Sequence, residues 1–94
     1  MKTYTVEVRD NGDKCWYLNG NLHREDGPAA EFVDGTKEWF LNGNLHREDG
    51  PAIEWVDGTK SWYIDGKELT EAEFNNRNHK TIVIDGKSYM LVEV

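Results

Sequence analysis

The sequence predicts a mostly β fold, an antiparallel meander of repeated β-hairpins with one short helix and a C-terminal hairpin. The first supporting observation is a repeat: the twelve residues Leu18–Ala29 recur letter for letter as Leu41–Ala52, a period of 23 residues. A fixed period of this length is typical of a repeat array. The second is a series of Asn-Gly and Asp-Gly pairs, a strong hairpin signal, between short aromatic and β-branched runs. These pairs begin at residues 11, 19, 34, 42, 57, 65 and 85.

The 94 residues are expected to form a single domain, residues 1–94. Residues 1–9 hold the predicted N-terminal strand, in which Tyr4 to Val8 alternate apolar and polar side chains, and residues 10–69 hold the array. Thr70 and Glu73 have the spacing of a capping box, with Leu69 and Phe74 as a hydrophobic staple, so a short helix is predicted over residues 70–77. Residues 80–94 form the predicted last hairpin, whose role the sequence leaves open. The flanking elements are expected to cap the array, because exposed sheet edges promote aggregation.

The repeated segment His-Arg-Glu-Asp-Gly-Pro, at residues 23–28 and 46–51, is predicted to be the corner between successive hairpins. Gly accepts unusual backbone angles and Pro fixes its own, so Asp-Gly-Pro is a strong turn signal. Pro28 and Pro51 also lack the amide hydrogen that a sheet ladder needs at this point.

The register follows from the assumption that Asp34-Gly35 is a two-residue turn, because this turn separates polar from apolar side chains better than a three-residue loop. Ala30 then opposes Trp39, and alternate residues share a face. One face is predicted to be buried and Trp-rich: Trp16, Leu18, Ala30, Phe32, Trp39, Leu41, Ile53, Trp55, Trp62 and Ile64. The other is mixed: Glu31, Glu38, Glu54 and Ser61 with Tyr17, Phe40 and Tyr63.

Charge and cysteine content exclude several classes of function. A formal net charge of −7 argues against direct binding to a nucleic-acid backbone, which requires basic surface. Cys15 is the single cysteine, so no intrachain disulfide and no cysteine metal cluster are expected. The sequence shows no apolar signal segment and no run long enough to span a membrane. A cytoplasmic protein without membrane contact is therefore predicted.

The unit Asp-Gly-Thr-Lys-x-Trp, followed by Leu-His-Arg-Glu-Asp-Gly-Pro-Ala, resembles the MORN-like repeat-variant proteins over roughly residues 10–74. Small members of this group are similar to proteins carried by tailed bacteriophages and some large viruses. The resemblance implies side-by-side β-hairpins and a non-enzymatic binding or scaffolding role, with no catalytic residues and no cofactor. For a phage-type protein it implies a host factor as target, such as a defence complex, and the host cytoplasm as location.

The corners carry the residue types of an alternative ligand site. His23 and His46, each near two carboxylates, have the chemistry of a metal or acid–base site, and Arg24 and Arg47 beside tryptophans could stack on a signalling nucleotide. Both sets are duplicated at the array period, which favours a structural role: packing beside tryptophan for the histidines, and pairing with glutamate and cation–π packing for the arginines. We therefore predict no enzyme and no metal, and keep nucleotide sequestration as an alternative.

The favoured function is binding of a protein that carries a basic patch. Aromatic side chains among charges are typical of protein interfaces. The predicted partner-binding residues are those of the mixed face: Tyr17, Phe40, Tyr63, Glu31, Glu38 and Glu54. Two further alternatives remain open, an acidic DNA mimic built from the glutamate row and a structural or homo-oligomerising repeat protein.

Overall fold

The structure, a computed structural model, describes residues 3–77 and 80–91, and it confirms the mostly β fold. All its paired strands are antiparallel, and α1 (Glu71–Asn76) is short. The strands are β1 (Tyr4–Val8), β2 (Lys14–Leu18), β3 (Asn21–Leu22), β4 (Ala30–Glu31), β5 (Lys37–Glu38), β6 (Phe40–Leu41), β7 (Asn44–Leu45), β8 (Ile53–Glu54), β9 (Lys60–Ile64), β10 (Lys67–Leu69), β11 (Lys80–Ile84) and β12 (Lys87–Leu91).

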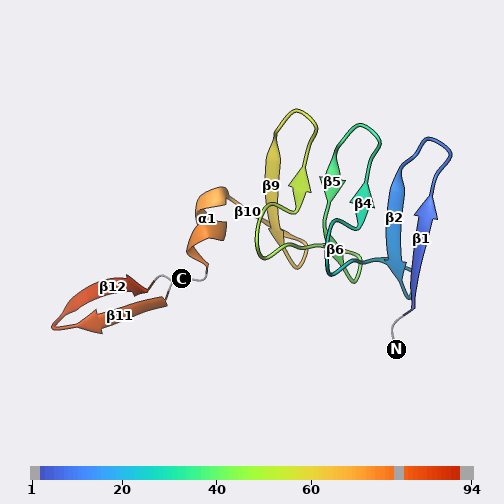
Figure 1. Ribbon diagram of the computed structural model, residues 1–94. Coiled ribbons are helices and arrows are strands. Elements are labelled where there is room, and N and C mark those ends of the chain that lie inside the picture. The colour runs from blue at the N-terminus through green and yellow to red at the C-terminus, as the bar shows by residue number, and fades with distance from the viewer. Residues whose placement is uncertain (1–2, 78–79, 92–94) are drawn as a thin grey trace.

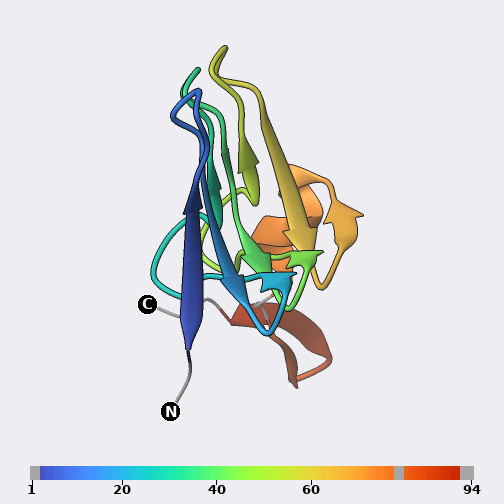
Figure 2. The same cartoon turned by 90° about the vertical axis from the view of Figure 1, so that its right-hand side faces the viewer.

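Tall hairpins stand side by side in one sheet with the order β1-β2-β4-β5-β8-β9-β10, and β3 joins β2 (Figure 1). Seen from the β1 end, the hairpins stand one behind another and α1 lies at the far end (Figure 2). Short hairpins below the main sheet link the repeats. The amide of Gly43 donates to the carbonyl of Leu22, and that of Gly66 donates to the carbonyl of Leu45, both at 2.8 Å. Each repeat is thus hydrogen-bonded to the next both in the main sheet and through the short hairpins.

The Asn-Gly and Asp-Gly pairs form two kinds of turn. Asn19, Asn42 and Asp65 have positive φ and begin two-residue turns, as the sequence predicts. The loop at Asp34-Gly35 differs, because Phe32 pairs with Thr36 and leaves three residues between them. The Asp34 carboxylate accepts the Thr36 amide at 2.8 Å and holds this longer loop. The predicted two-residue turn at Asp34-Gly35 is therefore wrong.

The longer loop shifts the register by one residue, and such a shift moves every side chain of a strand to the other face. Ala30 opposes Glu38 instead of Trp39, and Glu31 opposes Lys37. We name the two faces by their aromatic rows. The Trp face holds Lys14, Trp16, Glu31, Lys37, Trp39, Glu54, Lys60 and Trp62; the Tyr face holds Cys15, Tyr17, Ala30, Glu38, Phe40, Ile53, Ser61 and Tyr63.

The core is small and is made of small side chains more than of tryptophans. The buried apolar residues among those described are Cys15, Ala29, Ala30, Ala52, Ile53 and Phe74. Trp16, Trp39 and Trp62 are half-buried, and Trp55 is exposed. Trp16, Trp39 and Trp62 share one face as predicted, but that face is half-buried, and Ala30 and Ile53 lie on the opposite face. Ala29 and Ala52 are 0% exposed, and their carbonyls accept the amides of Trp16 and Trp39, so these small side chains are buried where neighbouring strands pair.

Helix α1 confirms the predicted capping box. Thr70 is the N-cap; its hydroxyl accepts the Glu73 amide at 3.1 Å, and the Glu73 carboxylate accepts the Thr70 amide at 2.9 Å. The second bond is also why the pKa of Glu73 is lowered. Phe74 is buried against the array. Within residues 3–77 and 80–91, no helix has the length and apolar character needed to cross a membrane.

Replacing Thr70 by alanine should lower the free energy of unfolding by about 1 kcal/mol, the usual value of an N-cap hydroxyl. The loss should concentrate in α1, so amide hydrogen exchange at Phe74 should accelerate more than exchange at β2. Thr70→Ser, which keeps the hydroxyl, is the control and should behave like the wild type. Equal losses in both variants would contradict the capping role.

The predicted last hairpin is present as β11 and β12, which pair with each other around the Asp85-Gly86 turn. It forms a separate two-stranded sheet, drawn beyond α1 in Figure 1. Residues 92–94 of the predicted span 80–94 lie outside the described residues. The N-terminal strand of the predicted 1–9 segment is β1, and residues 1–2 likewise lie outside.

Candidate binding surface

Each corner places an arginine on the preceding tryptophan of the Trp face. The Cζ atom of Arg24 lies 4.0 Å from the centroid of the Trp16 ring, and that of Arg47 lies 3.9 Å from the Trp39 ring. Each guanidinium also donates to the Asp of its own corner, to a proline carbonyl and to a glutamate of the next strand. For Arg47 these acceptors are Asp49, Pro51 and Glu54, at 2.9, 3.1 and 2.7 Å.

The glycine of each corner gives the guanidinium its space. A Cβ atom on Gly50 would lie 2.9 Å from Cζ of Arg47, and one on Gly27 would lie 3.1 Å from Cζ of Arg24. A side chain at either position would therefore require the guanidinium to shift from its place over the ring. The glycine of the Asp-Gly-Pro segment therefore serves the arginine–tryptophan stack as well as the turn.

These contacts bear on the nucleotide alternative. The arginine planes of Arg24 and Arg47 already lie against indole rings, and their N–H groups are bonded within the repeat. A nucleotide would have to displace these contacts in order to stack there. The arrangement is that of the cation–π packing considered above as the structural role.

His23 and His46 link successive repeats. The amide of Asn42 donates to Nδ1 of His23 at 2.9 Å, and the amide of Asp65 donates to Nδ1 of His46 at 3.0 Å. An accepting nitrogen carries no proton, so the hydrogen of each neutral ring is on Nε2. The Asp65 carboxylate lies 3.3 Å from Nδ1 of His46. The Nδ1 lone pair already accepts the Asp65 amide, so this short distance to the carboxylate follows from the position of Asp65 in the turn.

Nε2 of His23 lies 3.7 Å from the Glu25 carboxylate and is buried without a hydrogen bond. Nε2 of His46 lies 4.0 Å from that of Glu48. With Nδ1 used for the backbone, neither ring offers a lone pair to a metal in this state. Among the residues that the structure describes, no three His, Cys, Asp or Glu side chains are grouped to hold a metal ion.

The third repeat ends differently. Thr70 stands at the position where the earlier repeats have Arg24 and Arg47, so Trp62 has no arginine from its own corner. Helix α1 supplies Phe74 instead, with the Phe74 and Trp62 ring centroids 6.4 Å apart. Arg77 then stacks on Phe74 at 4.0 Å and donates to the backbone carbonyl of Glu48 in the second corner. The helix thereby closes the C-terminal end of the array.

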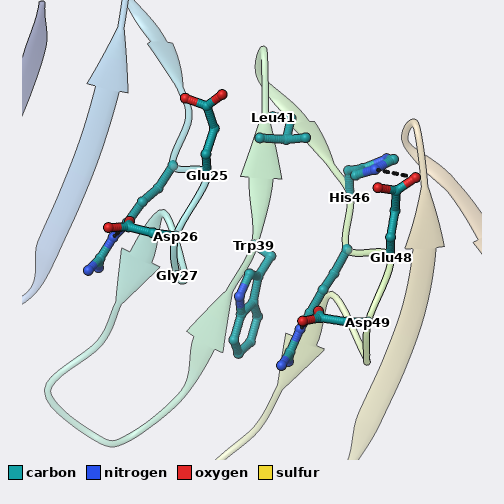
Figure 3. A pocket seen from close by; sticks show the side chains of 10 residues that line it. Glu25, Asp26, Gly27, Trp39, Leu41, His46, Glu48 and Asp49 are labelled. Atoms are coloured by element: carbon teal, nitrogen blue, oxygen red, sulfur yellow. Dashed lines mark hydrogen bonds and ion pairs between the residues drawn. The ribbon is translucent and has the colours of Figure 1, made fainter.

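A groove of about 590 Å³ opens between the two corners (Figure 3). Trp39 and Leu41 line its centre, Glu25 and Asp26 lie on one side, and Glu48 and Asp49 lie on the other. A related groove of about 440 Å³ lies one repeat earlier, over Trp16, where Tyr4 and Val6 of β1 replace the missing corner. The same kind of recess thus occurs twice on the Trp face.

The rim of the Trp39 groove is acidic and open to solvent. The side chains of Asp26, Glu48 and Asp49 are 86%, 79% and 87% exposed. The charged lining residues are two arginines and four acids, a formal charge of −2. The arginines are themselves paired with acids, so the surface left for a ligand is anionic around an aromatic centre.

The structure divides the six predicted partner-binding residues between two faces. Tyr17, Phe40, Tyr63 and Glu38 lie on the Tyr face, whereas Glu31 and Glu54 lie on the Trp face and bind Arg24 and Arg47. The prediction that all six share a face is therefore wrong, and the register shift is the reason. The three aromatic residues are half-buried. Helix α1 packs through Phe74 against Trp62, which lies on the Trp face.

The glutamate row of the proposed DNA mimic is also absent from the array. Glu31 and Glu54 alternate with lysines across five strands, in the order Lys14, Glu31, Lys37, Glu54 and Lys60. Opposite charges on directly opposed positions stabilise a sheet and leave little net charge. Glu38 lies on the other face, between Ala30 and Ile53.

Burial raises the pKa of Glu38, which occupies the position of Cys15 and Ser61 in the other repeats. A carboxyl with a raised pKa destabilises the folded state once pH rises above its unfolded value. Glu38→Gln should therefore raise the melting temperature at pH 7, and the gain should disappear below about pH 4, where both states are neutral. Glu68→Gln, at an exposed position, is the control. A pH-independent gain would contradict this explanation.

Sequence reasoning missed Gly50 as the space for Arg47, Phe74 as the cover of Trp62, and Glu48 and Asp49 as a groove rim. One signal was available for Phe74. Alignment of the repeats puts Thr70 where an arginine is required, so another residue had to cover the third tryptophan.

The fold and the corners define an array of β-hairpin repeats held together by arginine–tryptophan stacks and histidine–backbone bonds. No protein-family model, curated protein or solved structure matches the chain. The resemblance to MORN-like repeat variants therefore stays a prediction.

Proposed function

We propose that this chain is a non-enzymatic protein-binding module that docks through the Trp face and recognises a basic patch on its partner. The observation that carries the proposal is the groove over Trp39, with an aromatic and aliphatic centre and exposed carboxylates at its rim. Interfaces commonly combine an apolar centre with a polar rim. Complementary rim charge mainly accelerates association, so binding should weaken as salt rises.

The biological setting is part of the same proposal. The resemblance to small phage-type repeat proteins supports a host protein as the target and modulation or inhibition of a host factor, such as a defence complex, as the outcome. The single cysteine supports a reducing compartment, the host cytoplasm.

The proposal is tested by charge reversal at the groove. The full chain and its Glu48→Lys and Glu68→Lys variants are used as baits in bacterial lysate, captured proteins are identified by mass spectrometry, and binding of the purified partner is measured by calorimetry at two salt concentrations. Glu48→Lys should lose the partner and Glu68→Lys, with the same net charge, should keep it. Retention by Glu48→Lys together with loss on Phe40→Ala would move the interface to the Tyr face.

Self-association is a second candidate, favoured by strand β1. All five of its residues are exposed, and the apolar residues Tyr4, Val6 and Val8 are 39%, 49% and 63% exposed. An exposed apolar edge strand is a template for pairing with another chain, here a second copy of this one. Light scattering should show a dimer that Val6→Lys disrupts; a monomer at all concentrations would exclude this candidate.

A further inference from the structure

We propose that the groove over Trp39 receives an arginine side chain of the partner. The inference rests on the proposed function and adds the chemical identity of the group that is bound. Three features of the groove and its surroundings support it: the composition of its lining, the contact that this chain's own Arg77 makes in the neighbouring gap, and the geometry of the guanidinium group.

The lining combines the two surfaces to which a guanidinium binds. Trp39, which carries Arg47 on part of its ring, and Leu41 line the centre of the groove. Glu48 and Asp49 supply carboxylates at one side, and Asp49 also accepts from Arg47. A cation over an aromatic ring is stabilised by the ring's electrostatic quadrupole. A carboxylate accepts charge-assisted hydrogen bonds from the edge of the same cation. The formal charge of −2 at the lining favours a cation over an anion or a neutral side chain.

The neighbouring gap shows such a contact within this chain. Between the second corner and α1, the guanidinium of Arg77 lies over an aromatic ring, that of Phe74, and donates to the carbonyl of Glu48. The groove between the first and second corners also offers an aromatic ring and polar acceptors of the second corner, and its rim faces solvent. Arg77 thus shows that a guanidinium can combine an aromatic ring with an acceptor of the second corner, which is the combination that an arginine of the partner would use in the groove.

Arginine fits this groove better than lysine. The planar guanidinium can stack on an indole while its N–H groups reach carboxylates at the side, whereas the lysine ammonium is compact and strongly hydrated. Arg24 and Arg47 already use this double contact in both corners. The groove should therefore discriminate between peptides of equal charge.

The test uses capped hexa-arginine and hexa-lysine peptides titrated into the ¹⁵N-labelled full chain at low salt. Hexa-arginine should bind about two- to fivefold more tightly than hexa-lysine, the ratio expected for an exposed cation–π contact. The largest shifts should be at the indole N–H of Trp39 and at the amides of Glu48 and Asp49. Glu48→Gln should weaken hexa-arginine about two- to fivefold, and Glu68→Gln, which removes the same charge outside the groove, should weaken it less.

Equal affinity for the two peptides, equal effects of the two variants, or shifts centred on Tyr17, Phe40 and Tyr63 would overturn the inference. These results are separable from the proposed function. A protein partner lost on Glu48→Lys would uphold protein binding even if the peptides are not distinguished. Arginine-selective peptide binding without any partner would uphold the groove and reject the wider proposal.

Discussion

Replacing Trp39 by alanine is expected to lower the free energy of unfolding by about 3 kcal/mol, below the upper part of the range for a buried tryptophan because the ring is half-buried. The centroid of the indole ring lies 3.9 Å from the Cζ atom of Arg47. In the sequence, Trp39 lies between Ala29 and Ala52, which are both fully buried. For a domain of this size the melting temperature should fall by roughly 10–20 °C. Urea denaturation followed by circular dichroism measures the change.

Trp55→Ala provides the matched control for this prediction. Trp55 is 38% exposed, and no arginine stacks on it among the contacts of the described residues. Its loss should cost about 1 kcal/mol, mainly from partial loss of apolar burial. Similar losses at positions 39 and 55 would show that the arginine–tryptophan stacks do not hold the array together.

The second large effect is expected at Arg47. Its removal leaves Asp49 and Glu54 without their cation, the Pro51 carbonyl without its donor and the Trp39 ring uncovered. Breaking a fully buried ion pair costs about 3–5 kcal/mol, and the 21% exposure of this side chain reduces that to about 2–3 kcal/mol for Arg47→Ala. The same denaturation measurement applies.

Arg9→Ala is the control for charge, because Arg9 pairs with Glu7 at a half-exposed site, and its removal should change stability little. Arg47→Lys should recover only part of the loss, since lysine lacks the planar fork. A double-mutant cycle between Trp39→Ala and Arg47→Ala should show a coupling of about 0.5–1 kcal/mol. Full recovery by lysine would mean that charge alone stabilises the corner.

Both predictions concern the corners. The sequence identifies the corner residues, and the structure shows which contacts they make. Duplication at the array period favours a structural role for His23 and Arg24, and in the structure His23 accepts the Asn42 amide and Arg24 stacks on Trp16. The capping box of Thr70 and Glu73 placed α1 correctly, because a helix start depends on a few neighbouring residues. The groove over Trp39 could not be predicted, because its two walls come from different repeats and meet only in the folded array.

The sequence by itself determined the period, the strands and the two-residue turns at Asn19, Asn42 and Asp65, because positive φ at an Asn-Gly or Asp-Gly pair is a local preference. It did not determine the loop at Asp34-Gly35. There the same dipeptide type forms a longer loop, in which the Asp34 carboxylate accepts the Thr36 amide and a Cβ added at Gly35 would lie 3.5 Å from Val56 of the next repeat. The one extra residue in this loop decides which face each side chain of the following strand occupies. Only the tertiary structure therefore shows that Glu31 and Glu54 bind the arginines and that the corner carboxylates line the groove.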